Sequence, residues 1–145
     1  ESITERLSLY TRLDNCATEE DLQTFHVEMI DRFGPIPNEV EDLFTTVRCR
    51  WLGVELGFEK MSLKEQTMRC YFVNKNDSPY FESDTFKNIL EYLQTGTNKA
   101  KLKQVAKNFL LVVDDIKTMK EMERFLGFMH KAVRPKKIET ATTTN

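Results

Sequence analysis

The sequence has few of the residues that build nucleotide-binding turns. Its 145 residues include five glycines, at positions 34, 53, 57, 96 and 127. None of them belongs to a GxxxxGKS/T or GxGxxG pattern, which excludes the usual phosphate-holding turns. Gly53 and Gly57 have GxxxG spacing, but the residues around them are amphipathic, so the pair does not indicate a membrane-helix dimer. No apolar run approaches the ~20 residues that span a bilayer.

Cysteine and histidine are also scarce. The three cysteines, Cys16, Cys49 and Cys70, are odd in number and far apart, which fits neither a disulfide framework nor a CxxC metal site. The two histidines, His26 and His130, belong to no HExxH pattern. We therefore expect free thiols in a reducing cytoplasm, and no metal or cofactor site in this chain.

No motif of the chain indicates catalysis. A nucleophile elbow of the form GxSxG is absent. Asp114 and Asp115 follow an apolar stretch, where acid catalysts and metal ligands are often found. Acidic residues just before a helix also complement the helix dipole, and we favour that second interpretation. The sequence therefore predicts a domain that is not an enzyme by itself.

The composition indicates a folded domain of ordinary size. Hydrophobic residues make up 40% of the chain, charged residues 30%, and the net charge is −2, which is typical of a globular protein. We predict one domain over residues 1–133 and a flexible tail over residues 134–145. A division into two subdomains near Phe58 is the less favoured alternative. Because the chain starts without Met and within helical sequence, we expect a piece of a larger protein.

The first half of the sequence has helical periodicity. One helix is predicted over residues 3–14. Its apolar residues are Ile3, Leu7 and Tyr10 at helical spacing, with Leu9 and Leu13 beside them. A second helix starts after Thr18, a good N-cap, and stops at Gly34 and Pro35, because glycine suits a helix end and proline prevents continuation. The apolar stripe of this helix is Leu22, Phe25, Met29, Ile30 and Phe33.

A third helix has the longest periodic pattern in the chain. It starts near Pro37, whose fixed φ suits the first helical position, and it ends at Gly57. Its apolar stripe is Val40, Leu43, Phe44, Val47, Trp51, Val54 and Phe58. This stripe predicts that the third helix packs on the first two.

The second half alternates strand and helix patterns. The predicted elements are a strand over 67–73, a helix over 84–94, two strands within 99–113 that join at Lys107 and Asn108, and a helix from Thr118. Thr118 and Glu121 form a capping-box pattern at the start of that last helix. The predicted fold is therefore α+β, with three N-terminal helices packed with a small, largely antiparallel sheet and two further helices.

Three charged residues interrupt the apolar pattern of the second helix. On a helical wheel at about 100° per residue, Glu28 and Arg32 lie on one flank and Asp31 lies opposite the apolar stripe. Glu28 and Arg32 are spaced i,i+4 in the favourable order, which predicts a surface ion pair worth only ~0.2–0.5 kcal/mol. The same flank could instead form the rim of a protein interface, and periodicity does not decide between the two interpretations.

A basic cluster marks the first of the two strands within 99–113. Lys99, Lys101 and Lys103 project from one side of this strand and could bind phosphate groups. Lysines on the outer face of an edge strand also prevent aggregation, and no aromatic residue lies between them to stack on a base. We therefore favour an edge strand over the alternative, a nucleic-acid-binding module that uses the strand Lys99–Lys107 and the basic tail.

One long stretch of the sequence resembles a known family. Residues 5–44, ERLSLYTRLDNCATEEDLQTFHVEMIDRFGPIPNEVEDLF, are similar to the start of the C-terminal domain of bacterial transcription-repair coupling factor, the Mfd family. The matching positions are Arg6, Leu7, Tyr10, Arg12, Leu13, Glu28, Asp31, Arg32, Phe33, Gly34 and Pro37. The order of the later elements fits as well, so that the resemblance covers residues 3–133.

The resemblance implies a regulatory domain of a DNA-repair protein of the bacterial cytoplasm. Such proteins use an ATP-driven DNA translocase, with ATP and Mg outside this domain, to displace stalled RNA polymerase. They recruit UvrA through an N-terminal module similar to UvrB. The C-terminal domain is implied to dock on that module and hide its UvrA-binding surface. By motif match Glu28, Asp31 and Arg32 make this contact, the carboxylates facing arginines, while Gly34 and Pro37 are structural.

Overall fold

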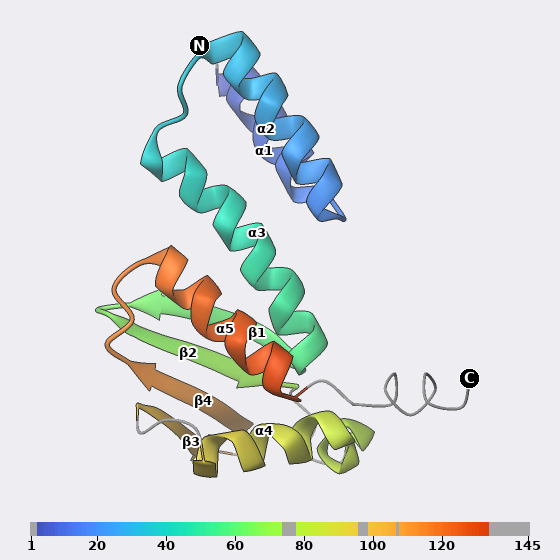
Figure 1. Ribbon diagram of the computed structural model, residues 1–145, viewed down its shortest axis with the longest axis vertical. Coiled ribbons are helices and arrows are strands. Elements are labelled where there is room, and N and C mark those ends of the chain that lie inside the picture. The colour runs from blue at the N-terminus through green and yellow to red at the C-terminus, as the bar shows by residue number, and fades with distance from the viewer. Residues whose placement is uncertain (1–2, 74–77, 96–98, 107, 134–145) are drawn as a thin grey trace, which may run out of the picture. The chain divides into compact units, whose positions relative to one another are not determined.

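The structure is a computed structural model that describes residues 3–73, 78–95, 99–106 and 108–133. Its elements are α1 (Ile3–Asp14), α2 (Glu19–Phe33), α3 (Asn38–Leu56), β1 (Phe58–Lys64), β2 (Thr67–Phe72), the 3-10 helix η1 (Pro79–Glu82), α4 (Asp84–Thr95), β3 (Ala100–Val105), β4 (Asn108–Asp114) and α5 (Met119–Val133). Figure 1 shows the three N-terminal helices and the sheet with its two later helices. The predicted α+β fold is confirmed.

Two compact units make up the chain, residues 1–48 and residues 49–145. The first holds α1, α2 and the start of α3, and the second holds the end of α3, the sheet, α4 and α5. The boundary therefore falls inside α3. Gly96, Lys107 and the predicted tail over 134–145 lie outside the described residues.

Local signals determine where α2 begins and ends. The hydroxyl of Thr18 accepts a hydrogen bond of 3.0 Å from the backbone N–H of Asp21, as an N-cap should. Gly34 ends the helix with φ 83° and ψ −159°, a backbone conformation that only glycine adopts easily. Pro37 accepts the first backbone bond of α3, from Glu41, so it is the N-cap residue, one position before the predicted one.

The helical unit buries only part of the apolar set that spacing predicts. Its buried apolar residues are Leu9, Leu13, Leu22, Phe25, Phe44 and Val47. On α1 the predicted stripe of Ile3, Leu7 and Tyr10 is exposed, and on α2 both Ile30 and Phe33 are exposed. The prediction is therefore wrong for these five residues and confirmed for Leu22 and Phe25, and an apolar surface remains open on the helical unit.

The sheet is antiparallel throughout and has the strand order β1-β2-β4-β3. The strand β1 is not among the predicted elements, and its pairing with β2 shifts register between Phe58 and Lys60. Phe58 and Val54 belong to the predicted stripe of the third helix, whereas Phe58 starts β1 and Val54 is exposed. The β3–β4 pair confirms the predicted hairpin, and β3 lies at an edge of the sheet.

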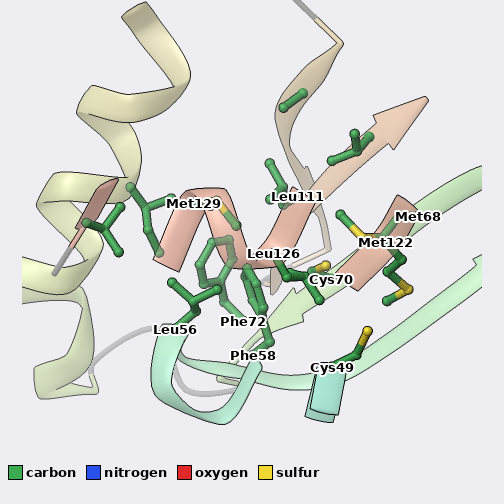
Figure 2. Packing of buried hydrophobic residues seen from close by; sticks show 14 of the residues in the cluster. Cys49, Leu56, Phe58, Met68, Cys70, Phe72, Leu111, Met122, Leu126 and Met129 are labelled. Atoms are coloured by element: carbon green, nitrogen blue, oxygen red, sulfur yellow. The ribbon is translucent and has the colours of Figure 1, made fainter. Parts of the chain in front are cut away.

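A single core joins one face of the sheet to the helices of the second unit. Met68, Cys70 and Phe72 from β2 are fully buried there, together with Leu111 from β4 (Figure 2). The helices contribute Leu56, Phe86, Ile89, Met122, Leu126 and Met129. Thr118 accepts a hydrogen bond of 3.1 Å from the backbone N–H of Glu121, which confirms the predicted cap of α5.

Candidate interaction surface on helix α2

Glu28 is bonded to α1. Its carboxylate accepts two hydrogen bonds from the guanidinium of Arg12, Nη1–Oε2 at 2.5 Å and Nη2–Oε1 at 2.9 Å. The same guanidinium lies 4.6 Å from the centre of the Phe25 ring, so Arg12 covers a core aromatic and holds the carboxylate at once. The hydrogen bonds from Arg12 lower the pKa of Glu28 below its ordinary value.

Arg32 makes a second link between the same two helices. Its Nη2 donates a hydrogen bond of 2.7 Å to Oε2 of Glu5, and its guanidinium lies 4.8 Å from the centre of the Phe33 ring. The predicted ion pair between Glu28 and Arg32 is therefore wrong, because each residue bonds to α1 instead. Two links along the helices fix α1 antiparallel to α2.

Asp31 differs from its two charged neighbours. Its carboxylate is exposed, and among the residues that the structure describes it has no hydrogen bond or ion pair. Val27, one turn earlier, is 59% exposed, and Ile30 is 42% exposed. The outward side of α2 thus combines a carboxylate that has no partner within the described ranges with two apolar side chains in water.

The opposite flank of α2 is bonded to α3. Glu19 accepts two hydrogen bonds of 2.8 Å from Arg48. His26 and Glu41 share a hydrogen bond of 2.9 Å, and the His26 ring meets Phe44 edge-on. Side chains on both flanks thus hold α2 in place. Asp31 and Val27 therefore lie on a helix that is bonded to its neighbours on both flanks.

The connection from α2 to α3 extends this surface. A hollow of about 510 Å³ is lined mainly by apolar groups, among them Met29, Phe33, Pro35, Ile36 and Val40. Gly34 lies in its wall, and a Cβ at this glycine would meet no other atom within 4 Å. Glycine is therefore needed here for its backbone angles and not for space.

The sequence pattern predicts the three charges of this surface but not its apolar part. It includes Ile30 in the apolar stripe of the helix and gives Val27 no role. One signal was available for Val27, since it lies on the wheel between the apolar stripe and Asp31, on the polar side of the helix. The exposure of Ile30 could not be inferred, because it depends on how far α1 and α3 cover α2.

The alternative acidic site lies where β4 ends and the connection to α5 begins. Asp114 accepts a long hydrogen bond of 3.4 Å from the Thr67 hydroxyl, and the Asp115 carboxylate lies 3.9 Å from Nζ of Lys117. Both residues precede α5. Within the described ranges no three His, Cys, Asp or Glu side chains gather in a way that could hold a metal ion. No described helix is long and apolar enough to cross a membrane.

The order of helices and strands defines the class of this chain. The solved crystal structure of the C-terminal domain of transcription-repair coupling factor has a similar fold, with a TM-score of 0.69 over 91% of this chain and 80% of that one. The two sequences are 16% identical, so this likeness concerns the fold alone. The chain is an α+β domain of that architecture.

The sequence comparison identifies the family. The TRCF domain model matches residues 1–83, and the chain therefore belongs to the TRCF domain family of transcription-repair coupling factors. The factor from Rickettsia conorii is 33% identical over 98 residues, which are 68% of this chain and 8% of that protein. The factor from Escherichia coli is 37% identical over 71 residues, 49% of this chain and 6% of that protein. The chain thus spans less than a tenth of the length of these relatives.

Proposed function

We propose that this chain is a regulatory interaction domain of a transcription-repair coupling factor. Residues 1–133 act as one domain that docks, through the outward side of α2, on the UvrB-like N-terminal module of the same protein. Docking masks the surface of that module that binds UvrA. The whole protein is an ATP-dependent DNA translocase of the bacterial cytoplasm that displaces stalled RNA polymerase, and its ATP and Mg sites lie outside this chain.

The observation that supports this proposal most is the surroundings of Asp31. A carboxylate with no ion pair to the described residues lies beside Val27 and Ile30, which remain exposed. Interfaces combine an apolar centre with charged groups that choose the partner. Arginines on the docking module would pair with Asp31 while the apolar side chains of both partners leave water.

Glu28 and Arg32 have a different part in this proposal. Each already bonds to a side chain of α1, so direct docking would require each to exchange partners. They instead hold α2 at a fixed position on α1, so that Asp31 and Val27 meet the partner without further ordering. The cost of immobilising loose side chains on binding is thereby reduced.

A weak interface is sufficient for such a lock. When two modules belong to one chain, the effective concentration of one at the other reaches about the millimolar range for a short flexible linker. Charged pairs at the rim can then be broken without unfolding either module. The domain would release the UvrB-like module when RNA polymerase is engaged.

The proposal is tested by reversing the charge of Asp31 in the full-length factor. The Asp31→Lys variant should bind UvrA more tightly than the wild type does, as measured by biolayer interferometry with immobilised UvrA. Asp42→Lys is the matched control, because Asp42 is also exposed and lies on α3. Equal UvrA binding by the wild type and Asp31→Lys would exclude Asp31 as the docking residue.

A further inference from the structure

The face of the sheet opposite the core carries a set of side chains that the proposed function does not use. Side chains alternate between the two faces of a strand, so the residues between Met68, Cys70 and Phe72 point away from the core. The register aligns them across all four strands. One row is Lys60, Tyr71, Leu110 and Lys103, and the next is Ser62, Arg69, Val112 and Lys101.

This outer face is basic, although the chain as a whole has a net charge of −2. The two rows and the adjacent end of β1 hold five cations, Lys60, Lys64, Arg69, Lys101 and Lys103. Among the described residues none of the five has an ion pair or a hydrogen-bonded carboxylate, and Lys60 contacts the Tyr71 ring. The aligned carboxylate of Asp114 lies at the end of the face and bonds to Thr67. No described acid therefore neutralises the centre of this face.

An aromatic ring lies among these cations. Tyr71 is half-buried on β2, and the ammonium of Lys60 lies 5.3 Å from the centre of its ring. The sequence shows no aromatic residue between the lysines of β3, but the sheet places Tyr71 in the same row as Lys103, with only Leu110 between them. The combination of a basic surface and a stacking ring is produced by the strand order and not by the local sequence.

Protection of the sheet edge does not account for this pattern. Lysines on β3 would suffice to keep an edge strand from pairing with another chain. Arg69 and Tyr71, however, belong to β2, which is bonded on both sides, to β1 and to β4. Their side chains therefore serve no edge, and the cations extend from one edge of the sheet to the other.

We propose that this outer face binds a single-stranded nucleic acid. Lys101, Lys103 and Arg69 contact the phosphate backbone, and one unpaired base stacks on the Tyr71 ring in place of the Lys60 ammonium. A sheet that presents an aromatic ring between cations is suited to splayed bases. A duplex fits less well, because reading its major groove takes a helix or ribbon that enters the groove. An acidic peptide would use the cations but would leave Tyr71 without a base to stack on.

The proposal is tested by fluorescence anisotropy of the 145-residue chain with a labelled oligothymidylate of about 12 nucleotides. Tyr71→Ala should weaken binding by about 5- to 100-fold, while Tyr71→Phe should keep it, because the ring does the stacking. The pair Lys101→Glu and Lys103→Glu, on an exposed strand, should weaken binding without unfolding the chain. The wild type should bind more weakly as the salt concentration rises. For each phosphate contact that a substitution removes, the slope of log K against log salt concentration should be about 0.7 smaller in magnitude.

Controls separate this site from general attraction to positive charge. Lys120→Glu with Lys131→Glu makes the same charge change on exposed residues of α5, and it should leave binding nearly unchanged. An equal loss in this control would overturn the proposal. So would duplex DNA of the same sequence binding as tightly as the single strand. Displacement of the oligonucleotide by a polyglutamate peptide, with no effect of Tyr71→Ala, would show that the face serves an acidic protein instead.

Discussion

The ring of Tyr80 occupies the space that a Cβ at Gly57 would need, and its hydroxyl donates a hydrogen bond of 2.5 Å to the carbonyl of Leu56. Gly57 has φ 96° and forms the turn between α3 and β1. A Cβ at this position would collide with the Tyr80 ring. We expect Gly57→Ala to lower the free energy of unfolding by at least about 2 kcal/mol, since the left-handed backbone alone costs an L-residue about 1–2 kcal/mol. Urea denaturation followed by circular dichroism measures this.

A second glycine provides the control for Gly57. Gly127 lies inside α5, and a Cβ there would meet no other atom within 4 Å. Gly127→Ala should therefore raise the free energy of unfolding by about 0.5–1 kcal/mol, because alanine loses less backbone entropy on folding. Equal effects of the two substitutions would show that the contact with Tyr80 does not restrict position 57.

The turn between β1 and β2 carries backbone strain. Its two central residues, Glu65 and Gln66, have φ 53° and 63°, as a two-residue hairpin turn of type I′ requires, yet neither is glycine or asparagine. Replacing the pair by Asn-Gly should raise the free energy of unfolding by about 1 kcal/mol, once the greater chain entropy of glycine is deducted. The backbone carbonyl of residue 66 can still accept its bond from Ile116. A lower melting temperature for the variant would contradict this account.

The three cysteines should differ sharply in reactivity. Cys49 and Cys70 lie in the core of the second unit (Figure 2), and burial raises the pKa of Cys49 to about 12 and that of Cys70 further still. Only the thiolate attacks thiol reagents. At pH 8 in native buffer, Ellman's reagent should therefore modify one thiol per chain, the partly exposed Cys16, and all three in urea. Native Cys16→Ser should therefore release no thionitrobenzoate rapidly, and a rapid release approaching one equivalent would contradict the buried state of Cys49 and Cys70.

The link between Arg12 and Glu28 should make stability depend on pH. Arg12 lowers the pKa of Glu28 in the folded chain. The carboxylate of Glu28 therefore takes up a proton at a higher pH in the unfolded chain than in the folded one. The stabilisation is therefore present at neutral pH and is lost as pH falls through the folded-state pKa of Glu28. In urea denaturation, the stability difference between the wild type and Glu28→Gln should shrink towards about pH 3, below the ordinary glutamate pKa of about 4.3.

The matched variant for this link is Arg12→Lys. Lysine keeps the positive charge but cannot donate two parallel hydrogen bonds to one carboxylate. The stability of the Arg12→Lys variant should therefore lie between that of the wild type and that of Glu28→Gln at neutral pH. A difference between wild type and Glu28→Gln that stays constant down to acid pH would show that the charge of Glu28 does not contribute.

Helix ends in this chain could be predicted from the sequence, whereas the faces that helices bury could not. Thr18 and Gly34 act through bonds and backbone angles within a few residues of themselves, so local sequence contains the information. On α1, Leu9 and Leu13 are buried and Ile3 is exposed, although both sets of residues have helical spacing. The choice between them is made by α2 and α3, which a single-helix pattern does not describe.

The sheet shows the same limit at longer range. The strand β1 has a weak apolar alternation and a register shift after Phe58, so it is recognisable only once β2 is beside it. Tyr71 and Lys103 are distant in sequence, and only the β2–β4 and β4–β3 registers align them. On α2, the motif match selected Glu28, Asp31 and Arg32 together. Their different partners depend on the position of α1, which the sequence pattern does not give.

The pair of Glu5 and Arg32 allows a direct test of whether Arg32 positions α2 or contacts the docking partner. Arg32→Glu alone places two carboxylates together and should lower the free energy of unfolding by up to about 1 kcal/mol, as expected for exposed charges. Adding Glu5→Arg restores an attractive pair with the charges exchanged. If Arg32 only positions the helix, the double variant of the full-length factor should regain wild-type stability and bind UvrA no better than the wild type. Enhanced UvrA binding by a stable double variant would instead place Arg32 itself in the docked interface.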